Sequence, residues 1–519
     1  MVSMIRCIVQ KTGWDKDFLV LFLLLLPLVV FFSFSKPWGV DYDFWETAAT
    51  VRELSVNFFH PSNPILMLPG DTSPRFVPYT MFWGLFNKIT HLGIFATMGI
   101  AGVTNYFIFI FGLYRFISKQ FRIDSLPTYT LGTMLLIWGS GYTWANAYHL
   151  EMFFVTLPYV GFFAFGLSLN ALYYLNCYCE GNKWRHLFFY SLLSVISFVT
   201  HPITGAFCFV AALALLVTYE NFKRAVFLQG VVLLAFGSSL IWPYFNYWDT
   251  FTNGAAQDWF ESPLFSGTIG ALGSSVMGFS IAAIYALRGK YLFLLYGILL
   301  CSFIYIISRV ADILIGGRFI FFLAFFLHLA IAVYIKQNKI LSLKKIWDSF
   351  RTDGLAIIVI FMLLAPSGIY RVKEMKKHIF RFQNGPSQIN GYNSPVKPYL
   401  FLSKHLSYGD VLLVNAHEGW VVPAITGARV VAPQKLNPLM VEESNLRKRD
   451  VAKFFKSWLS TEDRIRLIRK YHITHIMINL KNERNWDPSL RNQLKVIGLE
   501  EASENSLILY KVAKSIGSL

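Results

Sequence analysis

The feature that most constrains this chain is a series of long apolar runs separated by short clusters of Lys and Arg. A helix needs about 20 mainly apolar residues to cross the hydrocarbon core of a bilayer, and the first such run covers residues 18–35. Hydrophobic residues make up 55% of the 519 and charged residues only 15%, which excludes an ordinary soluble protein. The sequence therefore predicts a polytopic α-helical membrane protein.

The basic residues predict how the chain crosses the membrane. A net charge of +17 is also typical of nucleic-acid binding, but here Lys and Arg gather between apolar runs, where they mark the cytoplasmic side. Arg6, Lys11 and Lys16 precede the first run and no small-residue cleavage site follows, so we expect an uncleaved anchor with a cytoplasmic N-terminus. Because Pro202 breaks a helix, residues 186–219 are expected to form two short helices that meet at His201. The predicted topology has about 11 crossings, at about 18–35, 93–116, 127–145, 153–177, 186–219 (two), 225–243, 269–287, 291–308, 318–335 and 354–369.

Residues 371–519 have a different character. Short β-like runs alternate with helical patterns, which predicts a small α/β domain. The β-like runs are 411–414, 429–431, 473–480 and 507–510, and the helical patterns are about 447–458 and 461–471. This part has no cysteine, so no disulfide framework is expected in it. We therefore expect a transmembrane domain over 1–370, with a first outer loop at 36–78, and an extracytoplasmic domain over 371–519.

Three carboxylates stand directly after the first apolar run, at Asp41, Asp43 and Glu46. Such a cluster is suited to deprotonating a hydroxyl as a general base, to holding a divalent cation, or to both. The alternative is that these residues cap a helix and fill its first turn, where negative charge is favourable. The two interpretations are compatible. The chain has no Walker or dinucleotide glycine motif, so we do not expect an ATP-driven pump.

The order of these parts resembles the GT-C superfamily of integral membrane glycosyltransferases, and the resemblance covers essentially the whole chain. Asp41-Tyr42-Asp43 resembles the Asp-x-Asp of the mannosyltransferases of glycolipid anchors. Further segments resemble bacterial and archaeal members: His60-Pro61-Ser62-Asn63-Pro64, Ser73-Pro74-Arg75-Phe76, His201-Pro202-Ile203-Thr204-Gly205, Gly317-Arg318-Phe319, Thr426-Gly427-Ala428-Arg429-Val430-Val431 and Arg449-Asp450-Val451. The resemblance implies that the acids of the first outer loop form the catalytic centre.

Seven further residues are candidates for substrate binding: His60, Arg75, His149, Glu151, His201, Arg309 and Arg318. Each has a plainer interpretation. His60 starts a turn, Arg75 anchors the chain at lipid headgroups, and His149 lies with Glu151 in a hydrated loop.

The plainer interpretations of the other candidates are also structural. His201 is a hydrogen-bonded histidine at a helix break, Arg309 pairs with Asp312, and Arg318 extends toward the interface. The functional interpretation of His201 is that an ionisable residue at membrane depth faces a cavity. The functional interpretation of Arg309 and Arg318 is that they hold a lipid-linked phosphate through their forked donors. In the tail, His417-Glu418-Gly419-Trp420 follows a predicted strand and is either a binding loop or a strand-to-helix turn.

Together these features predict a glycosyltransferase of the plasma (inner) membrane that moves a sugar from a polyprenyl-phosphate donor to a glycan, lipid or protein acceptor, with inversion. A divalent cation at Asp41 and Asp43 is an open possibility, and no nucleic-acid partner is expected. One alternative is a lipid-linked glycan polymerase or ligase, against which the loop 244–268 counts because it lacks Lys and Arg. The other is a polytopic transporter or lipid flippase, which would not explain the long outer tail.

Overall fold

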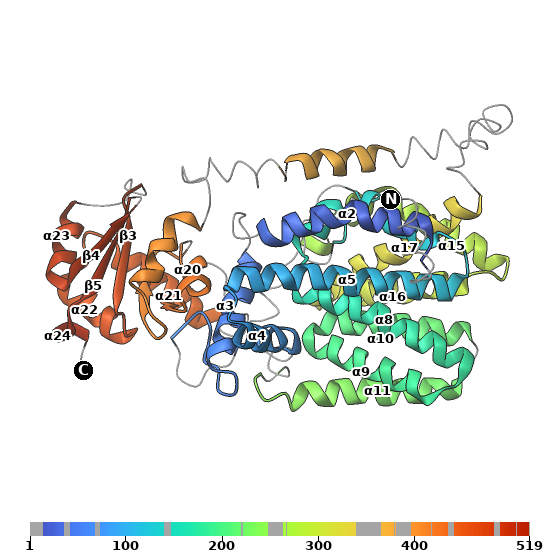
Figure 1. Cartoon of the computed structure of the whole chain (residues 1–519), viewed down its shortest axis with the longest axis horizontal. Helices are drawn as coiled ribbons and strands as arrows, with labels where there is room; N and C mark the ends of the chain where they lie inside the picture. Colours follow the sequence, from blue (N-terminus) through green and yellow to red (C-terminus); the bar gives the residue numbers. More distant parts are fainter. Residues whose placement is uncertain are drawn as a thin grey trace. The chain divides into compact units, whose positions relative to one another are not determined.

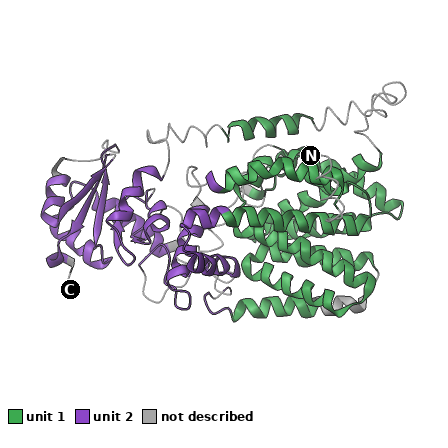
Figure 2. Ribbon diagram, viewed as in Figure 1, with its two compact units in different colours: residues 1–33, 100–241, 260–379 green, residues 34–99, 242–259, 380–519 purple. Residues whose placement is uncertain are grey.

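The computed structural model describes residues 14–35, 42–67, 73–139, 147–219, 222–245, 247, 263–265, 267–338, 365–377, 379, 396–416, 418–433, 441–481, 488–504 and 506–517. Two compact units make up the chain (Figure 2). Unit 1 comprises residues 1–33, 100–241 and 260–379, and unit 2 comprises residues 34–99, 242–259 and 380–519. The division therefore does not follow a single boundary near residue 370, because the first loop belongs with the tail.

Unit 1 is helical (Figure 1). It contains most of α2 (Lys16–Ser35) and α5 (Ile94–Phe121), then α6 (Leu126–Leu136), α7 (Leu150–Val155), α8 (Val160–Gly181), α9 (Trp184–Thr200), α10 (Pro202–Thr218), α11 (Phe222–Leu240), η2 (Pro263–Phe265), α14 (Thr268–Leu272), η3 (Gly273–Val276), α15 (Met277–Leu287), α16 (Leu292–Val310), η4 (Leu314–Arg318), α17 (Phe319–Gln337) and a helix over 365–377.

The membrane prediction is confirmed for the part of the chain that the structure describes. Six helices there are long and apolar enough to cross a bilayer: Lys16–Ser35, Ile94–Phe121, Val160–Gly181, Thr268–Leu287, Leu292–Val310 and Ile315–Gln337. Two shorter apolar helices are Pro202–Thr218 and Gln229–Leu240. The chain is thus a multi-pass membrane protein. The total of 11 crossings stays a prediction, since most of the last expected span, 354–369, lies outside the described residues.

Two expected spans can be compared with the helices directly. The break at His201 is confirmed, because α9 ends at Thr200 and α10 begins at Pro202. The continuous span at about 127–145 is wrong, because α6 ends at Leu136. At this end the imidazole Nε2 of His328 hydrogen-bonds the Ile137 carbonyl at 2.5 Å, so this carbonyl has a partner outside the helix.

Unit 2 contains α3 (Tyr42–Val56), α4 (Pro78–Thr90) and the tail elements. Helix α3 is buried on several sides, with Phe44, Trp45, Val51 and Leu54 all inside unit 2. Helix α4 packs closely against it at Gly84, whose missing side chain leaves room for Leu54. This close approach fixes α3 against the loop that precedes α4.

The tail forms the expected small α/β domain, with a five-stranded mixed sheet in the order β2-β1-β3-β5-β4 (Figure 1). The strands are β1 (Val411–Leu413), β2 (Arg429–Val430), β3 (His475–Asn479), β4 (Gly498–Glu504) and β5 (Leu507–Val512). Strand β1 is parallel to β2 and β3, whereas β5 is antiparallel to β3 and β4. The helical elements are η5 (Lys397–Lys404), α20 (Val421–Thr426), α21 (Val441–Phe454), α22 (Thr461–Lys470), α23 (Pro488–Ile497) and α24 (Lys514–Gly517).

The hydrophobic core of the tail joins the sheet to its helices. It includes Ile476 of β3, Ile508 of β5, Phe454 of α21, Ile468 of α22 and Leu494 of α23. Sequence reasoning found β1, β2, β3 and β5 because their residues are apolar. It missed β4, since that edge strand is polar and mostly exposed.

Candidate active site

Helix α3 carries two of the three predicted catalytic carboxylates. Asp43 lies in its first turn, and Glu46 follows one turn later. Between them, Phe44 and Trp45 are buried and pack on Phe95, with ring centroids 6.3 and 5.9 Å from it. These aromatic contacts hold the start of the helix, while the side chains of Asp43 and Glu46 stay 28% and 15% exposed. The capping interpretation and the catalytic one therefore both remain compatible with Asp43.

Arg75 joins these two acids. Its Nη2 donates to Oε2 of Glu46 at 2.8 Å and lies 3.7 Å from Oδ1 of Asp43. Burial acts to lower the pKa of Arg75, but the carboxylates of Glu46 and Asp43 outweigh it and raise that pKa. One guanidinium thus offsets the mutual repulsion of two carboxylates. The sequence predicted all three residues for the same site, and the structure brings them together.

The turn before α4 sets the position of Arg75. The Thr80 hydroxyl is fully buried, accepts from the Val77 amide at 3.1 Å and donates to the Arg75 carbonyl at 2.5 Å. The Arg75 amide in turn donates to the Ser73 hydroxyl at 3.2 Å. Next in the chain, the Phe76 carbonyl accepts from the indole of Trp242 at 2.7 Å, also within unit 2. The backbone of Arg75 is therefore fixed on both sides.

The other predicted residues of the first loop do not add to this cluster. His60 is exposed in the bend that follows α3. Asp41 lies outside the described residues, so its place relative to Asp43 is not part of this description. Among the residues that the structure does describe, no group of three or more His, Cys, Asp or Glu is placed to hold a metal ion. The divalent-cation hypothesis depends on Asp41 and is left untested.

His149 and Glu151 belong to unit 1, at the start of α7. His149 is fully buried and is the N-cap residue, with its Nδ1 accepting from the Met152 amide at 3.4 Å. Glu151 follows in the first turn, and its charge acts on Arg371, a buried residue in the helix over 365–377. Arg371 also donates to the Gly139 carbonyl. The sequence analysis did not single out Arg371, although an Arg beside an apolar segment is the feature that made Arg309 and Arg318 candidates.

The remaining three candidates also belong to unit 1. His201 stands between α9 and α10, and its Nδ1 hydrogen-bonds the Thr204 hydroxyl at 2.8 Å. Arg309 is exposed in the last turn of α16, with its guanidinium carbon 5.5 Å from the ring centre of Phe265. Arg318 is half-buried where η4 leads into α17. These placements leave the substrate-binding hypothesis for each residue as a prediction.

In the tail, the segment after β1 is a helical turn rather than an open loop. Glu418 is buried there and accepts from the side chain of Asn479 at 2.6 Å, while its neighbour His417 lies outside the described residues. Burial raises the pKa of Glu418, and the hydrogen bond from Asn479 opposes this only in part. A second polar cluster of unit 2, around Glu53 of α3 and Arg429 of β2, was not predicted as a pair.

Comparison with known proteins identifies the fold. No protein-family model matches the sequence, and no curated protein matches it either. Among solved structures, ArnT from Cupriavidus metallidurans in the apo state is similar, with a TM-score of 0.55 and 12% identity over 98% of this chain and 100% of that one. The Archaeoglobus fulgidus oligosaccharyltransferase tethered to an acceptor peptide is similar with a TM-score of 0.50 and 12% identity, over 96% of this chain and 74% of that one. The chain therefore shares its overall fold with these two proteins, in agreement with the fold expected from the sequence.

Proposed function

We propose that this chain is a GT-C glycosyltransferase that moves a sugar from a polyprenyl-phosphate donor to an acceptor hydroxyl at the outer face of the plasma membrane. The observation that carries the proposal is the cluster of Asp43, Glu46 and Arg75 at the start of α3. The cluster occurs in a chain whose fold matches that of ArnT over nearly its full length. The membrane-spanning helices of unit 1 supply the apolar surroundings that a lipid-linked donor requires.

The cluster suits direct displacement at the anomeric carbon. A carboxylate of Asp43, or of Asp41, takes the proton of the acceptor hydroxyl as its oxygen attacks. The bond between the anomeric carbon and the phosphate oxygen breaks, and its electron pair leaves with polyprenyl phosphate. Attack from the opposite face inverts the anomeric carbon. Asp43 is favoured over Glu46 as the base because Arg75 bonds Glu46 directly, at 2.8 Å, and holds Asp43 only at 3.7 Å.

A lipid-linked donor follows from the proposed location. Nucleotide sugars are not expected outside the cytoplasm, so a sugar used there arrives on a membrane lipid. Negative charge on the donor phosphate increases as the sugar leaves, and a preorganised Arg stabilises such charge. We assign this task to Arg318 and Arg309. His60, His149, Glu151 and His201 are assigned to sugar or acceptor contacts, and a divalent cation at Asp41 and Asp43 would neutralise charge at the same point.

The test uses the purified full chain in lipid nanodiscs with polyprenyl-phosphate sugars, and measures released polyprenyl phosphate. We expect turnover by the wild type, a loss of about 100-fold or more in Asp43→Asn or Asp41→Asn, and no change in Glu180→Gln. Glu180 is a suitable control because it pairs with Lys119 and Arg122 in unit 1, away from the acids of α3 in the chain. Full turnover in both aspartate variants would contradict the site assignment. Loss of activity on addition of a chelator, with recovery on adding Mn²⁺ or Mg²⁺, would establish the metal.

The same assay separates the alternative functions. A glycan polymerase or ligase would use a diphosphate-linked oligosaccharide and release polyprenyl diphosphate instead. A transporter or flippase would move the lipid across the bilayer without any transfer of sugar. Either result would contradict the proposed donor, and the second would contradict an enzyme altogether.

A further inference from the structure

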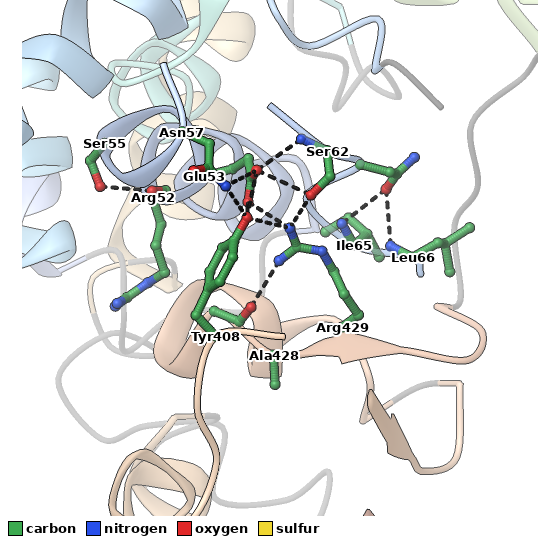
Figure 3. A network of polar contacts seen from close by, with 12 residues as sticks. Arg52, Glu53, Ser55, Asn57, Ser62, Ile65, Leu66, Tyr408, Ala428 and Arg429 are labelled. Carbon is green, nitrogen blue, oxygen red and sulfur yellow. Dashed lines mark hydrogen bonds and ion pairs between the residues drawn. The ribbon is translucent and has the colours of Figure 1, made fainter. Parts of the chain in front are cut away.

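Glu53, a buried residue, is the centre of a polar network that lies within unit 2 (Figure 3). Its Oε2 is 2.5 Å from Nη2 of Arg429, and the two side chains are only 1% and 5% exposed. The Tyr408 hydroxyl is 2.8 Å from both carboxylate oxygens, and the Ser62 amide and hydroxyl donate to Oε1 at 2.8 and 3.1 Å. Asn57 donates to the Tyr408 hydroxyl at 2.6 Å. The network thus joins α3 and the first loop to the tail.

Two further contacts join the same parts. Nε of Arg52, next to Glu53, donates to the Ala424 carbonyl of α20 at 2.9 Å. The Val430 amide of β2 donates to the Ile65 carbonyl at 2.8 Å, and Leu66 forms a parallel bridge with Val430. The first loop therefore extends the edge of the tail sheet beyond β2. Because these contacts involve backbone as well as side chains, they define one relative orientation of α3 and the tail.

The buried ion pair is suited to fixing that orientation. A buried charge is tolerated only when an opposite charge or a hydrogen-bond donor lies beside it with good geometry. Here each carboxylate oxygen of Glu53 has such a partner. Because hydrogen bonds are directional, a turn or slide of α3 would break several of them together. Apolar contacts alone tolerate such shifts more easily.

The position of Glu53 on α3 links this network to the acids. Glu53 follows Glu46 by seven residues, which in an α-helix is about two full turns and about 10.5 Å along the axis. The two side chains therefore lie on nearly the same face of one helix. Whatever holds Glu53 also sets the rotation and the height of Glu46 and Asp43.

We propose that Glu53 and Arg429 are positioning residues, through which the tail domain holds α3 so that its acids stand in the reactive position. This inference rests on the proposed function of Asp43 and Glu46. It assigns the tail a part in the rate of the reaction, whether or not the tail also contacts an acceptor. Misplacement of a reacting group by about 1 Å lowers rates about 100-fold, so loosening the pair should act mainly on kcat.

The test compares Glu53→Gln, Arg429→Gln and the double variant with Asp450→Asn, all in the full chain. Glutamine keeps the size of Glu53 but leaves the Arg429 charge uncompensated. Asp450 is a matched control, because its carboxylate pairs with Lys470 inside the tail and its loss leaves α3 untouched. We expect each single variant to lower kcat about 10- to 100-fold with little change in KM. The double variant should lose less than the product of the two single losses, since no unpaired charge remains.

A second measurement does not depend on catalysis. Hydrogen exchange of the amides in 42–56 and 425–433 should be faster in Glu53→Gln and unchanged in Asp450→Asn. If the wild type transfers no sugar while this exchange effect is present, the proposed function fails and the link between the tail and α3 stands. Should Glu53→Gln fail to fold, Tyr408→Phe removes one hydroxyl from the carboxylate and should give a smaller loss of the same kind. Wild-type kcat and exchange in all these variants, or a change in KM alone, would overturn the proposal.

Discussion

Gly84 provides a direct test of how α4 holds α3. A Cβ added at this position would lie 2.5 Å from the Cβ of Leu54 and 3.3 Å from its carbonyl carbon. Non-bonded carbon atoms prefer about 3.5–4.0 Å, so Gly84→Ala must push the two helices apart by about 1 Å. Part of the contact is with the backbone of Leu54, which no change of rotamer relieves.

The magnitude follows from two opposing effects. Alanine stabilises a helix interior by about 1 kcal/mol relative to glycine, whereas overpacking a close contact costs about 1–3 kcal/mol. The expected net change is a destabilisation of about 0–2 kcal/mol at the α3–α4 contact. Gly132→Ala in α6 is the matched control, because a Cβ there meets no heavy atom within 4 Å. That substitution should stabilise its helix by up to about 1 kcal/mol.

The assay is hydrogen exchange of α3 and α6, which reports local opening free energies separately for each helix. A change of 1.4 kcal/mol corresponds to about a tenfold change in exchange rate. We expect faster exchange in α3 for Gly84→Ala and slower exchange in α6 for Gly132→Ala. The first variant should also lose sugar transfer, because a displaced α3 separates Glu46 from Arg75. Unchanged exchange in α3 for Gly84→Ala would refute the close approach.

Two further predictions concern single polar groups. Thr80→Val removes the hydroxyl that bonds the Val77 amide and the Arg75 carbonyl. We expect this variant to lose about 1–3 kcal/mol of stability and to transfer sugar more slowly, whereas Thr80→Ser should keep the stability and the activity of the wild type. Equal activity of the valine and serine variants would contradict this. Burial lowers the pKa of His475 from 6.5, although the nearby Asp410 and Glu501 oppose the shift. Below pH 6.5 the unfolded tail therefore binds a proton that the folded tail excludes. The free energy of unfolding of the tail thus decreases as the pH is lowered. The urea midpoint of the tail should drop between pH 8 and pH 5.5 by more in wild type than in His475→Gln; equal drops would rule out this histidine as the cause.

The sequence determined the class of the protein and the composition of the acid cluster. Long apolar runs specify membrane helices because the bilayer demands internally satisfied backbone groups, and this physical rule is local. The same holds for the break at Pro202, for Asp43 and Glu46 one turn apart on a helix, and for the β-like runs of the tail. In each case the decisive information lies within a few consecutive residues.

Tertiary structure decided which hydrogen-bond and ion-pair partners the polar residues have. The sequence suggested Arg75 as a neighbour of the acids, but only folding placed its Nη2 at 2.8 Å from Glu46. The sequence around Glu53 does not predict its contact with Arg429, which is 376 residues away. At the end of α6, the Ile137 carbonyl likewise finds its partner in His328, far along the chain. Such contacts arise because buried polar groups must find partners wherever the fold brings them. Residue type and spacing thus specified the helix that carries Asp43 and Glu46, and the fold of unit 2 specified what holds that helix in place.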